Sequence, residues 1–179
     1  IVKYLIKSRD FEQQYLLATT DGLTELYNHR YFQEQIRMQV EHSKRYNNNF
    51  SLIIIDIEFF KKLNDTFGHQ SGDAVLRQVA QTLKKNVRAT DIVCRYGGEE
   101  MSIILPNTSK EEALATAQKI CNKVAEKKFK LTGNNETNVT ISLGVATFPS
   151  DGDTAPKIIE SADKKLYYAK NNGRNQVGK

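Results

Sequence analysis

The sequence predicts an α/β (α+β) domain in which helices wrap a central mixed, mostly antiparallel sheet. Three observations support this class: a buried strand pattern over residues 50–56, a strand–turn–strand pattern over residues 92–105, and amphipathic helical patterns around both. A hairpin inside the sheet excludes an all-parallel arrangement. At 179 residues, the chain is long enough for one domain with a substantial buried core.

The N-terminal residues 1–20 are expected to form the end of a connecting helix, and residues 21–179 the domain itself. Apolar side chains are loosely spaced between Ile1 and Ala18, and Thr20-Asp21-Gly22 is typical of a helix break. The chain begins with Ile rather than Met. We therefore expect a segment of a longer protein.

Each element of the domain has its own sequence pattern. The run Phe50 to Asp56 is rich in β-branched residues and suits a strand buried on both faces. Residues 73–87 carry the clearest amphipathic stripe, and Ser109 with Glu112 forms a capping box that opens another helix. The expected elements are a helix over 29–46, a strand over 50–56, a helix over 73–87, strands over 92–96 and 101–105, a helix from 109, a strand over 138–148 and a helix over 154–172 that stops at Gly173.

Composition excludes several classes of protein. Apolar residues make up 39% and charged residues 26% of the chain, as in a soluble globular domain. No apolar run approaches the roughly 20 residues that span a bilayer, so we expect no membrane contact by this segment. Cys94 and Cys121 lack metal-binding spacing and do not form a disulfide framework pattern, so a reducing cytoplasm is the expected location. The net charge of +5 comes largely from scattered lysine pairs, without a zinc-finger or RNP pattern, so no nucleic acid is expected as a partner.

Carboxylates are expected to meet where two strands end. Asp56 closes the buried strand, and Glu99 and Glu100 follow Gly97-Gly98 at the hairpin tip. Such oxygen ligands suit Mg²⁺ or Mn²⁺, and the glycines leave room for a polyphosphate near the backbone. A pair of these metals can acidify a hydroxyl and stabilise a displaced phosphate. From the spacing alone, however, an ordinary polar hairpin with a strand-end Asp is the favoured interpretation.

Basic residues near these carboxylates favour a functional site. Lys61 follows Asp56 by five positions, and Lys170 and Arg174 lie one helical turn apart around the last helix end. Cations of this kind can neutralise the β- and γ-phosphates of a nucleotide. Taken singly, each of them has the plain interpretation of a surface cation.

The segment between Asn64 and Asp73 contains the side chains that guanine requires. A carboxylate can accept hydrogen bonds from guanine N1–H and N2–H, and an amide can serve O6 and N7. Such a site discriminates against adenine, because adenine leaves its buried polar groups unpaired. The plain alternative is that Asp73 caps the helix that it begins.

Five motifs in order resemble those of the GGDEF family of diguanylate cyclases. They span nearly everything from Asp21 to Asn175: DGLTELYNHRYF, IIIDIEFFKKLNDTFGHQSGDAVL, RYGGEEM, TISLGVATFP and ADKKLYYAKNNGRN. The resemblance implies a sheet wrapped by helices, similar to class III nucleotidyl cyclases and polymerase palms. It also implies a metal-dependent transferase of bacterial second-messenger signalling, the output domain of a larger sensor that is either soluble or membrane-bound.

The resemblance also implies roles for single residues. Asp56, the carbonyl of Ile57 and Glu99 would hold two Mg²⁺ or Mn²⁺ ions in each half-site, and Glu100 would support metal and nucleotide. Glu99 would also help to deprotonate the ribose 3′-OH. The remaining implied contacts are Lys61, Lys170, Arg174 and the backbone amides of Phe59 and Phe60 for the triphosphate, Asn64 and Asp73 for guanine with His69 nearby, and Arg95, which either contacts phosphate or braces the turn.

The implied reaction joins two GTP molecules. Each domain would hold one GTP, and two domains would meet about a two-fold axis so that each 3′-OH attacks the partner's α-phosphate. A symmetric product, cyclic di-GMP, fits a symmetric homodimer, and the dimer geometry would control turnover. The helix over residues 1–18 would transmit that geometry from an N-terminal sensor domain.

A further motif concerns regulation. Arg88-Ala89-Thr90-Asp91 matches the RxxD inhibitory site of the family, with five residues between it and the glycine pair. Arginine can bind guanine or phosphate edges through two hydrogen bonds, and Asp can pair with guanine. A helix-end Arg followed by a turn Asp is the plain alternative. We expect cyclic di-GMP to bind at Arg88 and Asp91 and to restrain turnover.

Two residues depart from the family pattern. Met101 replaces the usual Phe of the signature, which we expect to be a packing change. Glu58 stands where many members have Asp, and we expect its side chain to point away from the metal side. Neither change removes a predicted ligand or phosphate-binding cation.

Other functions remain to be weighed against the cyclase. A catalytically inactive receptor for GTP or cyclic di-GMP is the main alternative, but such a module would typically have lost an acidic signature residue or a phosphate-binding cation. A mixed cyclic GMP–AMP product is disfavoured by Asp73, because adenine offers no N1–H or N2 amine. A pure scaffold would not need the acidic cluster.

Overall fold

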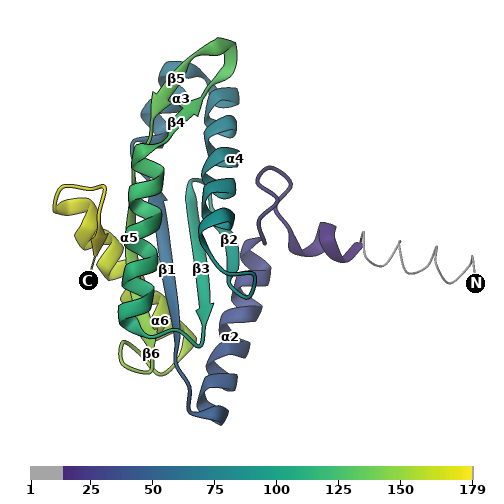
Figure 1. Cartoon of the computed structure of the whole chain (residues 1–179). Coiled ribbons are helices and arrows are strands. Elements are labelled where there is room, and N and C mark those ends of the chain that lie inside the picture. The colour runs from purple at the N-terminus through teal and green to yellow at the C-terminus, as the bar shows by residue number, and fades with distance from the viewer. Residues whose placement is uncertain (1–13, 179) are drawn as a thin grey trace, which may run out of the picture.

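The computed structural model describes residues 14–178, in which helices flank a central five-stranded sheet on both faces (Figure 1). Residues 14–19 are helical, as expected, whereas the rest of the predicted connecting helix, residues 1–13, lies outside the described residues. The helices are α2 His29–Tyr46, α3 Phe60–Phe67, α4 His69–Asn86, α5 Lys110–Glu126 and α6 Ala155–Asn171, with a 3-10 turn η1 at Thr132–Asn134. The strands are β1 Phe50–Ile57, β2 Ile92–Gly97, β3 Glu100–Pro106, β4 Lys128–Lys130, β5 Glu136–Asn138, β6 Ile141–Phe148 and β7 Val177–Gly178.

The sheet has the strand order β2-β3-β1-β6-β7. Antiparallel pairs join β2 to β3, β3 to β1 and β1 to β6, while the short β7 runs parallel to β6. The predicted mixed, mostly antiparallel sheet is therefore confirmed. Strands β4 and β5 form a separate small hairpin, visible beyond α5 in Figure 1.

Strand β1 lies at the centre of the sheet and all its residues are buried, as its β-branched run predicts. Alternate side chains of a strand face opposite sides. Ile53 and Ile55 accordingly join a cluster with α4 and α5, and Leu52 and Ile54 join a second cluster with α2 and α6. The two clusters form the core and fix how β1 delivers its last residues to the sheet edge.

Helix ends follow the local signals where those signals are strong. The Ser109 hydroxyl accepts from the Glu112 amide at 3.3 Å, and the Glu112 carboxylate accepts from the Ser109 amide at 2.9 Å, so the predicted capping box is present. Gly173, just after α6, takes a left-handed φ of 113°. Within the described residues no helix is both long and apolar enough to cross a membrane.

Three boundaries differ from the prediction. The helix expected from Asp73 begins earlier, at His69, and a separate short helix, α3, precedes it. Gly68 divides the two with a φ of 81°, a conformation that glycine adopts without strain. Asp73 therefore lies inside α4 and does not cap it. The strand predicted over 138–148 is interrupted after Asn138, and its main part begins at Ile141.

Candidate active site

The edge of the sheet where β1 ends brings the first candidate residues together. The antiparallel register of β1 and β3 aligns Asp56 with Glu100, and directly opposed residues project from the same face. Glu100 also pairs with Gly97 across an irregularity in β2, so the turn through Glu99 closes near enough for its charge to act on Asp56. Adjacent strands thus deliver the three predicted carboxylates to one edge.

Burial and mutual repulsion determine the charge state of this edge. Burial raises the pKa of Asp56, the Lys170 ammonium opposes that shift, and the charges of Glu58 and Glu99 add to it. Burial also raises the pKa of Glu100, and the charge of Asp56 adds to that shift. The carboxylates therefore repel one another in a partly desolvated setting, and additional positive charge would stabilise them.

Two cations from the C-terminal end of α6 pair with these carboxylates. Lys170 Nζ lies 2.9 Å from Asp56 Oδ2, and Arg174 Nε lies 2.7 Å from Glu58 Oε2. The other Glu58 oxygen accepts a hydrogen bond from Ser142 Oγ at 2.5 Å. The prediction that Glu58 points away from the metal side is wrong, because its carboxylate accepts from Ser142, which stands opposite Asp56 in the β1–β6 register.

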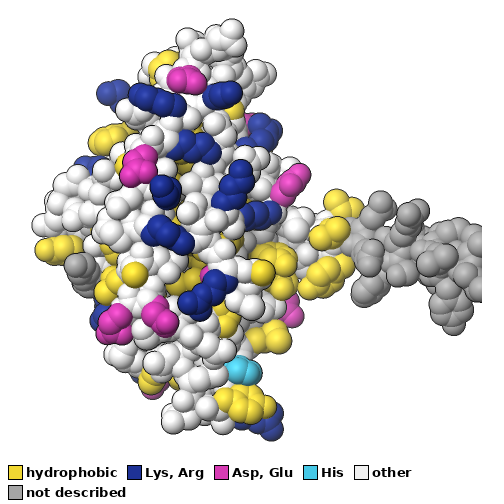
Figure 2. All heavy atoms as spheres, viewed as in Figure 1, with side chains coloured by type: hydrophobic (Ala, Val, Ile, Leu, Met, Phe, Trp, Pro, Cys, Tyr) yellow, Lys and Arg dark blue, Asp and Glu magenta, His cyan; other side chains and the backbone are white. Residues whose placement is uncertain are grey.

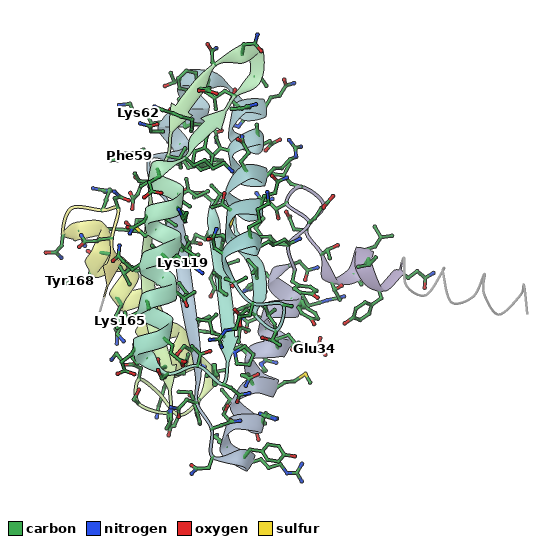
Figure 3. The ribbon with its side chains drawn as sticks, viewed as in Figure 1. Glu34, Phe59, Lys62, Lys119, Lys165 and Tyr168 are labelled. Atoms are coloured by element: carbon green, nitrogen blue, oxygen red, sulfur yellow. The ribbon has the colours of Figure 1, made fainter. Side chains whose placement is uncertain are left out.

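The start of α3 adjoins the same edge. Phe59 takes a left-handed φ of 55°, and α3 begins at Phe60 without a side-chain cap. The first amide groups of a helix have no partner within it, so this end of α3 is suited to an anion. The Phe59 side chain is exposed beside α3 (Figure 3), and the Arg174 guanidinium lies over its ring, 5.1 Å from the centroid.

A cleft of about 470 Å³ extends from the hairpin tip to α4. Three residues predicted to contact guanine line it, namely Asn64, His69 and Asp73, and Lys61 and Glu99 line it as well. The predicted site residues therefore form two adjoining groups. The cleft is one, and the sheet edge with the α6 cations is the other.

The Asn64 amide has an unusual environment in this cleft. Its Oδ1 atom is buried and accepts no hydrogen bond from the described part of the chain. It lies against Gly72, where a Cβ atom would stand only 1.9 Å from Oδ1 and 3.1 Å from the Phe60 ring. Buried polar atoms are almost always paired, so this acceptor is suited to a ligand donor. Sequence reasoning missed Gly72, whose contact with Asn64 arises only from the packing of α3 on α4.

Arg95 braces the hairpin tip. Its Nη1 atom lies 3.1 Å from both carboxylate oxygens of Asp21, and its Nε and Nη2 atoms donate to the Gly98 carbonyl at 3.0 and 2.9 Å. Burial alone would raise the pKa of Asp21, but hydrogen bonds from Thr24 and Arg95 hold it below the ordinary value. The turn after the N-terminal helix is thereby tied to the glycine turn, which agrees with the bracing role among the two expected for Arg95.

Matches to known proteins agree with this arrangement. A family model described as "Diguanylate cyclase, GGDEF domain" matches residues 18–176. Response regulator PleD of Caulobacter vibrioides is 46% identical over 162 residues, covering 90% of this chain and 36% of that protein. Diguanylate cyclase A of Treponema denticola is 42% identical over 167 residues, covering 90% of this chain and 44% of that protein. The chain belongs to the GGDEF family.

A solved GGDEF structure has the same fold. The coiled coil and GGDEF domain of DgcB from Caulobacter crescentus, in complex with c-di-GMP, matches with a TM-score of 0.92 and 31% identity, covering 99% of this chain and 93% of that one. The chain spans less than half the length of the two sequence relatives named above. Family membership therefore describes this domain, and the longer relatives contain further segments.

A second polar pocket surrounds the RxxD motif of this GGDEF domain. Arg88, Asp91 and Lys119 line a pocket of about 280 Å³, on a face where Figure 2 shows many Lys and Arg side chains. Burial raises the pKa of Asp91, although Arg88 and Lys119 oppose the shift, and Asp91 Oδ1 is buried without a partner in the described residues. Lys119, labelled on α5 in Figure 3, has no sequence signal, because α5 is distant from the motif along the chain.

The carboxylate edge fits a divalent cation in its chemistry. Within residues 14–178 no three Asp, Glu, His or Cys side chains stand close enough together to hold a metal ion, and Lys170 is paired with Asp56 instead. The oxygen donors are nevertheless those that Mg²⁺ and Mn²⁺ prefer. Burial, with added repulsion from neighbouring carboxylates, raises the pKa values of Asp56 and Glu100, so a nearby cation would stabilise their charged forms. GGDEF cyclases generally use divalent metal ions, and this donor set is compatible with that use.

Proposed function

We propose that this domain is a diguanylate cyclase that condenses two GTP molecules into cyclic di-GMP and releases two pyrophosphates. The observation that supports it most is the continuity between the cleft and the carboxylate edge, since Glu99 lines the one and acts electrostatically on Asp56 in the other. A nucleotide with its base near Asn64 and Asp73 would carry its ribose and phosphates toward that edge.

In this proposal the carboxylate edge carries out the chemistry. Asp56, the Ile57 carbonyl and Glu99 hold two Mg²⁺ or Mn²⁺ ions per half-site, with support from Glu100. When bound, such ions lower the pKa of a hydroxyl and stabilise negative charge on phosphate. Glu99 orients the ribose 3′-OH and accepts its proton, and Lys61 offsets the charge that develops on the attacked phosphate.

The phosphates and the base are bound by different elements. Lys61, Lys170 and Arg174 bind the triphosphate together with the backbone amides of Phe59 and Phe60. Binding of the triphosphate requires Lys170 to exchange its Asp56 partner for a phosphate oxygen. The guanine contacts are Asn64, whose Oδ1 has no protein partner, and Asp73, with His69 beside them in the cleft.

The proposal includes a homodimer, because one domain binds one GTP and the product joins two. A two-fold axis lets each 3′-OH attack the partner's α-phosphate, which matches the symmetry of cyclic di-GMP. A sensor domain attached through residues 1–20 would set this geometry and so control the rate. The DgcB structure with the same fold also contains a coiled coil.

We further propose that cyclic di-GMP inhibits turnover at the RxxD pocket. The guanidinium of Arg88, the ammonium of Lys119 and the unpaired Asp91 oxygen supply donors and an acceptor for guanine and phosphate edges. Substitution Arg88→Ala should relieve inhibition by added product while leaving the initial rate unchanged. Product inhibition that persisted at the original concentration in this variant would contradict the assignment.

The activity itself is tested by incubating the protein with GTP and Mg²⁺ and detecting cyclic di-GMP by mass. The proposal expects product, with more of it from a version dimerised through a coiled coil fused at the N-terminus. Protein that binds GTP but yields no product, even when dimerised, would favour the catalytically inactive receptor. A mixed cyclic GMP–AMP product formed from GTP and ATP would instead contradict the guanine assignment of Asp73.

A further inference from the structure

Glu58 is more deeply buried than Asp56 at the carboxylate edge. Only 2% of its side chain is exposed, against 9% for Asp56. Both its oxygens are engaged, one by Ser142 Oγ at 2.5 Å and the other by Arg174 Nε at 2.7 Å. A buried carboxylate is costly unless it is paired and hydrogen-bonded, so this geometry is a specific attachment between β1, β6 and the segment after α6.

Arg174 is held from several sides. Its guanidinium lies over the Phe59 ring, and its backbone has a left-handed φ of 59°, between Gly173 and Asn175, which also have positive φ angles. Its amide donates to the Ala169 carbonyl at 3.0 Å. A non-glycine residue keeps such a backbone only where the surroundings impose it, and the Glu58 carboxylate and the Phe59 ring are the contacts that reach the guanidinium.

The contact with Glu58 leaves part of the guanidinium available. An arginine presents five N–H donors in a planar fork, and Glu58 engages it through Nε. Within the described residues, the two Nη groups donate no hydrogen bond to protein, and 43% of the side chain is exposed. A carboxylate at Nε thus orients the fork while its Nη donors remain free for the paired oxygens of a phosphate.

We propose that Glu58 is a positioning residue, which fixes the Arg174 guanidinium so that its Nη groups meet the triphosphate of GTP. The inference rests on the proposed function, since it assumes that Arg174 binds phosphate. It assigns Glu58 neither to the metal nor to guanine. Glu58 stands where many family members have the shorter Asp. The longer Glu side chain reaches Arg174 with one oxygen and Ser142 with the other.

Electrostatic repulsion alone and the positioning role predict opposite effects on GTP binding when the Glu58 charge is removed. Glu58 is an anion near the place where a polyanion binds, so its neutralisation should strengthen GTP binding by reducing repulsion. Positioning predicts weaker binding, because the freed Arg174 side chain must be ordered when the ligand binds. The sign of the change in affinity therefore separates the two accounts.

The test compares GTP with GMP in EDTA, by calorimetric titration of wild-type protein, Glu58→Gln, Arg174→Ala and the double variant. EDTA removes any contribution of Glu58 through a metal ion. We expect Glu58→Gln to weaken GTP binding by about threefold to tenfold, the cost of ordering one long side chain, and to leave GMP binding unchanged. The double variant should bind GTP no more weakly than Arg174→Ala alone. Ser142→Ala, which loosens Glu58 but keeps its charge, should give a smaller loss of the same kind.

Distinct results would overturn the inference and the function beneath it. If Arg174→Ala weakens GTP binding but Glu58→Gln does not, or strengthens it, the positioning role fails and the cyclase proposal stands. If wild-type protein binds GTP no more tightly than GMP, or Arg174→Ala keeps the full preference for GTP, the phosphate role of Arg174 fails and this inference fails with it. Should Glu58→Gln unfold, as judged by circular dichroism, Ser142→Ala alone must still show the GTP-specific loss.

Discussion

Carboxylates near the two ends of strand β1 have pKa shifts in opposite directions. At the end near Phe50 the hydroxyl and carboxylate groups are paired, whereas Asn48 Oδ1 is buried without a partner in the described residues. The buried Ser51 hydroxyl donates to the Thr108 carbonyl at 3.0 Å and lies 2.8 Å from Thr147 Oγ1. Nearby, one Asp151 oxygen pairs with Lys110 at 3.3 Å and Lys165 at 3.0 Å, while the other accepts from the Thr147 amide.

At the other end of β1 the carboxylates also have partners, since Lys170 contacts Asp56 and Arg174 contacts Glu58, but these cations do not offset burial in the same way. Burial and neighbouring anions raise the pKa values of Asp56 and Glu100, and Asn64 Oδ1 accepts no hydrogen bond within the described chain. By contrast, burial alone would raise the pKa of Asp151, but Lys165 and the Thr147 amide hold it below the ordinary value. The protein's own groups outweigh the effect of burial at Asp151 but not at Asp56 and Glu100, where a further cation would stabilise the charged forms.

The opposite pKa shifts distinguish polar groups that stabilise the fold from polar groups that are suited to binding. Burying a charge or polar atom without full compensation costs free energy, about 1–3 kcal/mol for one unpaired atom, so a fold keeps such groups mainly where something else satisfies them. Sequence-level rules of consistency fail most often at functional sites. The Asp56 end meets that description, and substitutions at the two ends should therefore differ in what they affect.

The largest effect is expected from Glu99→Ala. If Glu99 accepts the ribose proton, its loss should lower the rate of cyclic di-GMP formation by about a thousandfold, within the range for a general base. The temperature of unfolding should not fall, because the removed carboxylate belongs to the repulsive cluster. Glu34→Ala, an exposed site on α2 (Figure 3), is the matched control and should keep full activity. Full turnover by Glu99→Ala would contradict the role of Glu99 as the acceptor of the ribose proton.

Local sequence signals predicted most of the fold. The β-branched run of β1, the capping box at Ser109 and the glycine stop at Gly173 each depend on neighbours within a few residues, and each is confirmed. Short elements escaped prediction, because β7 is defined only by its pairing with β6. Helix α3 was also missed, as was the start of α4 before Asp73.

The candidate site was predictable as a set of residues but not as a geometry. Motif resemblance selected Asp56, Glu99 and Asn64, yet no spacing rule reveals that β1–β3 register aligns Asp56 with Glu100. Residues contributed by distant elements were invisible for the same reason. Lys119 reaches the RxxD pocket from α5, and the side of the strand on which Glu58 lies was predicted wrongly.

A smaller effect is expected from Gly72→Ala, which would move the Asn64 amide without replacing any residue that we propose to contact GTP. The new methyl group would displace the Asn64 amide, whose Oδ1 lies 1.9 Å from the Cβ position. We expect GTP affinity to fall by about tenfold to a hundredfold, the cost of one mispaired buried group. Alanine is favoured over glycine inside a helix by about 1 kcal/mol, so stability should be largely preserved.

Calorimetric titration with GTP and thermal unfolding check this prediction together. Gly22→Ala is the matched control, because no atom lies within 4 Å of the Cβ position there, and it should bind GTP normally. Gly72→Ala protein that bound GTP as wild type would show that the Asn64 position is not fixed by Gly72. Weak binding together with a large loss of stability would mean that the substitution disturbs packing rather than the amide.

The hairpin tip is expected to show an intermediate effect on turnover. Protein groups brace it, yet it carries Glu99 at the Asp56 end of β1. Asp21→Asn removes the charge that holds Arg95 against the Gly98 carbonyl. We expect turnover to fall by about threefold to tenfold, since a loosened turn misplaces Glu99. Rate measurements on the single variants and on Asp21→Asn/Arg95→Gln test the link. The double variant should be no slower than Arg95→Gln alone, whereas multiplied losses would mean that the two residues act independently.

The smallest effect on activity is expected near the Phe50 end of β1, from Asp151→Asn. Turnover should be unchanged, whereas the free energy of unfolding should fall by about 1–3 kcal/mol, the value of charge-assisted hydrogen bonds. The folded-state pKa of Asp151 lies below its ordinary value of 3.8. Its contribution is therefore fully present above pH 3.8 and is lost as the pH falls through the folded value. Denaturant unfolding at neutral and acidic pH should thus show wild type and variant converging in acid.

An exposed ion pair supplies the control for this end of the strand. Asp153 pairs with Lys157 at 2.8 Å, but both side chains are more than 60% exposed. Surface pairs contribute little, so Asp153→Asn should leave unfolding unchanged at every pH. If Asp151→Asn behaved like Asp153→Asn, the polar groups near Phe50 would contribute no more than surface charges. If it instead slowed turnover while the protein stayed folded, the two ends of β1 would be functionally coupled and the division between them would be wrong.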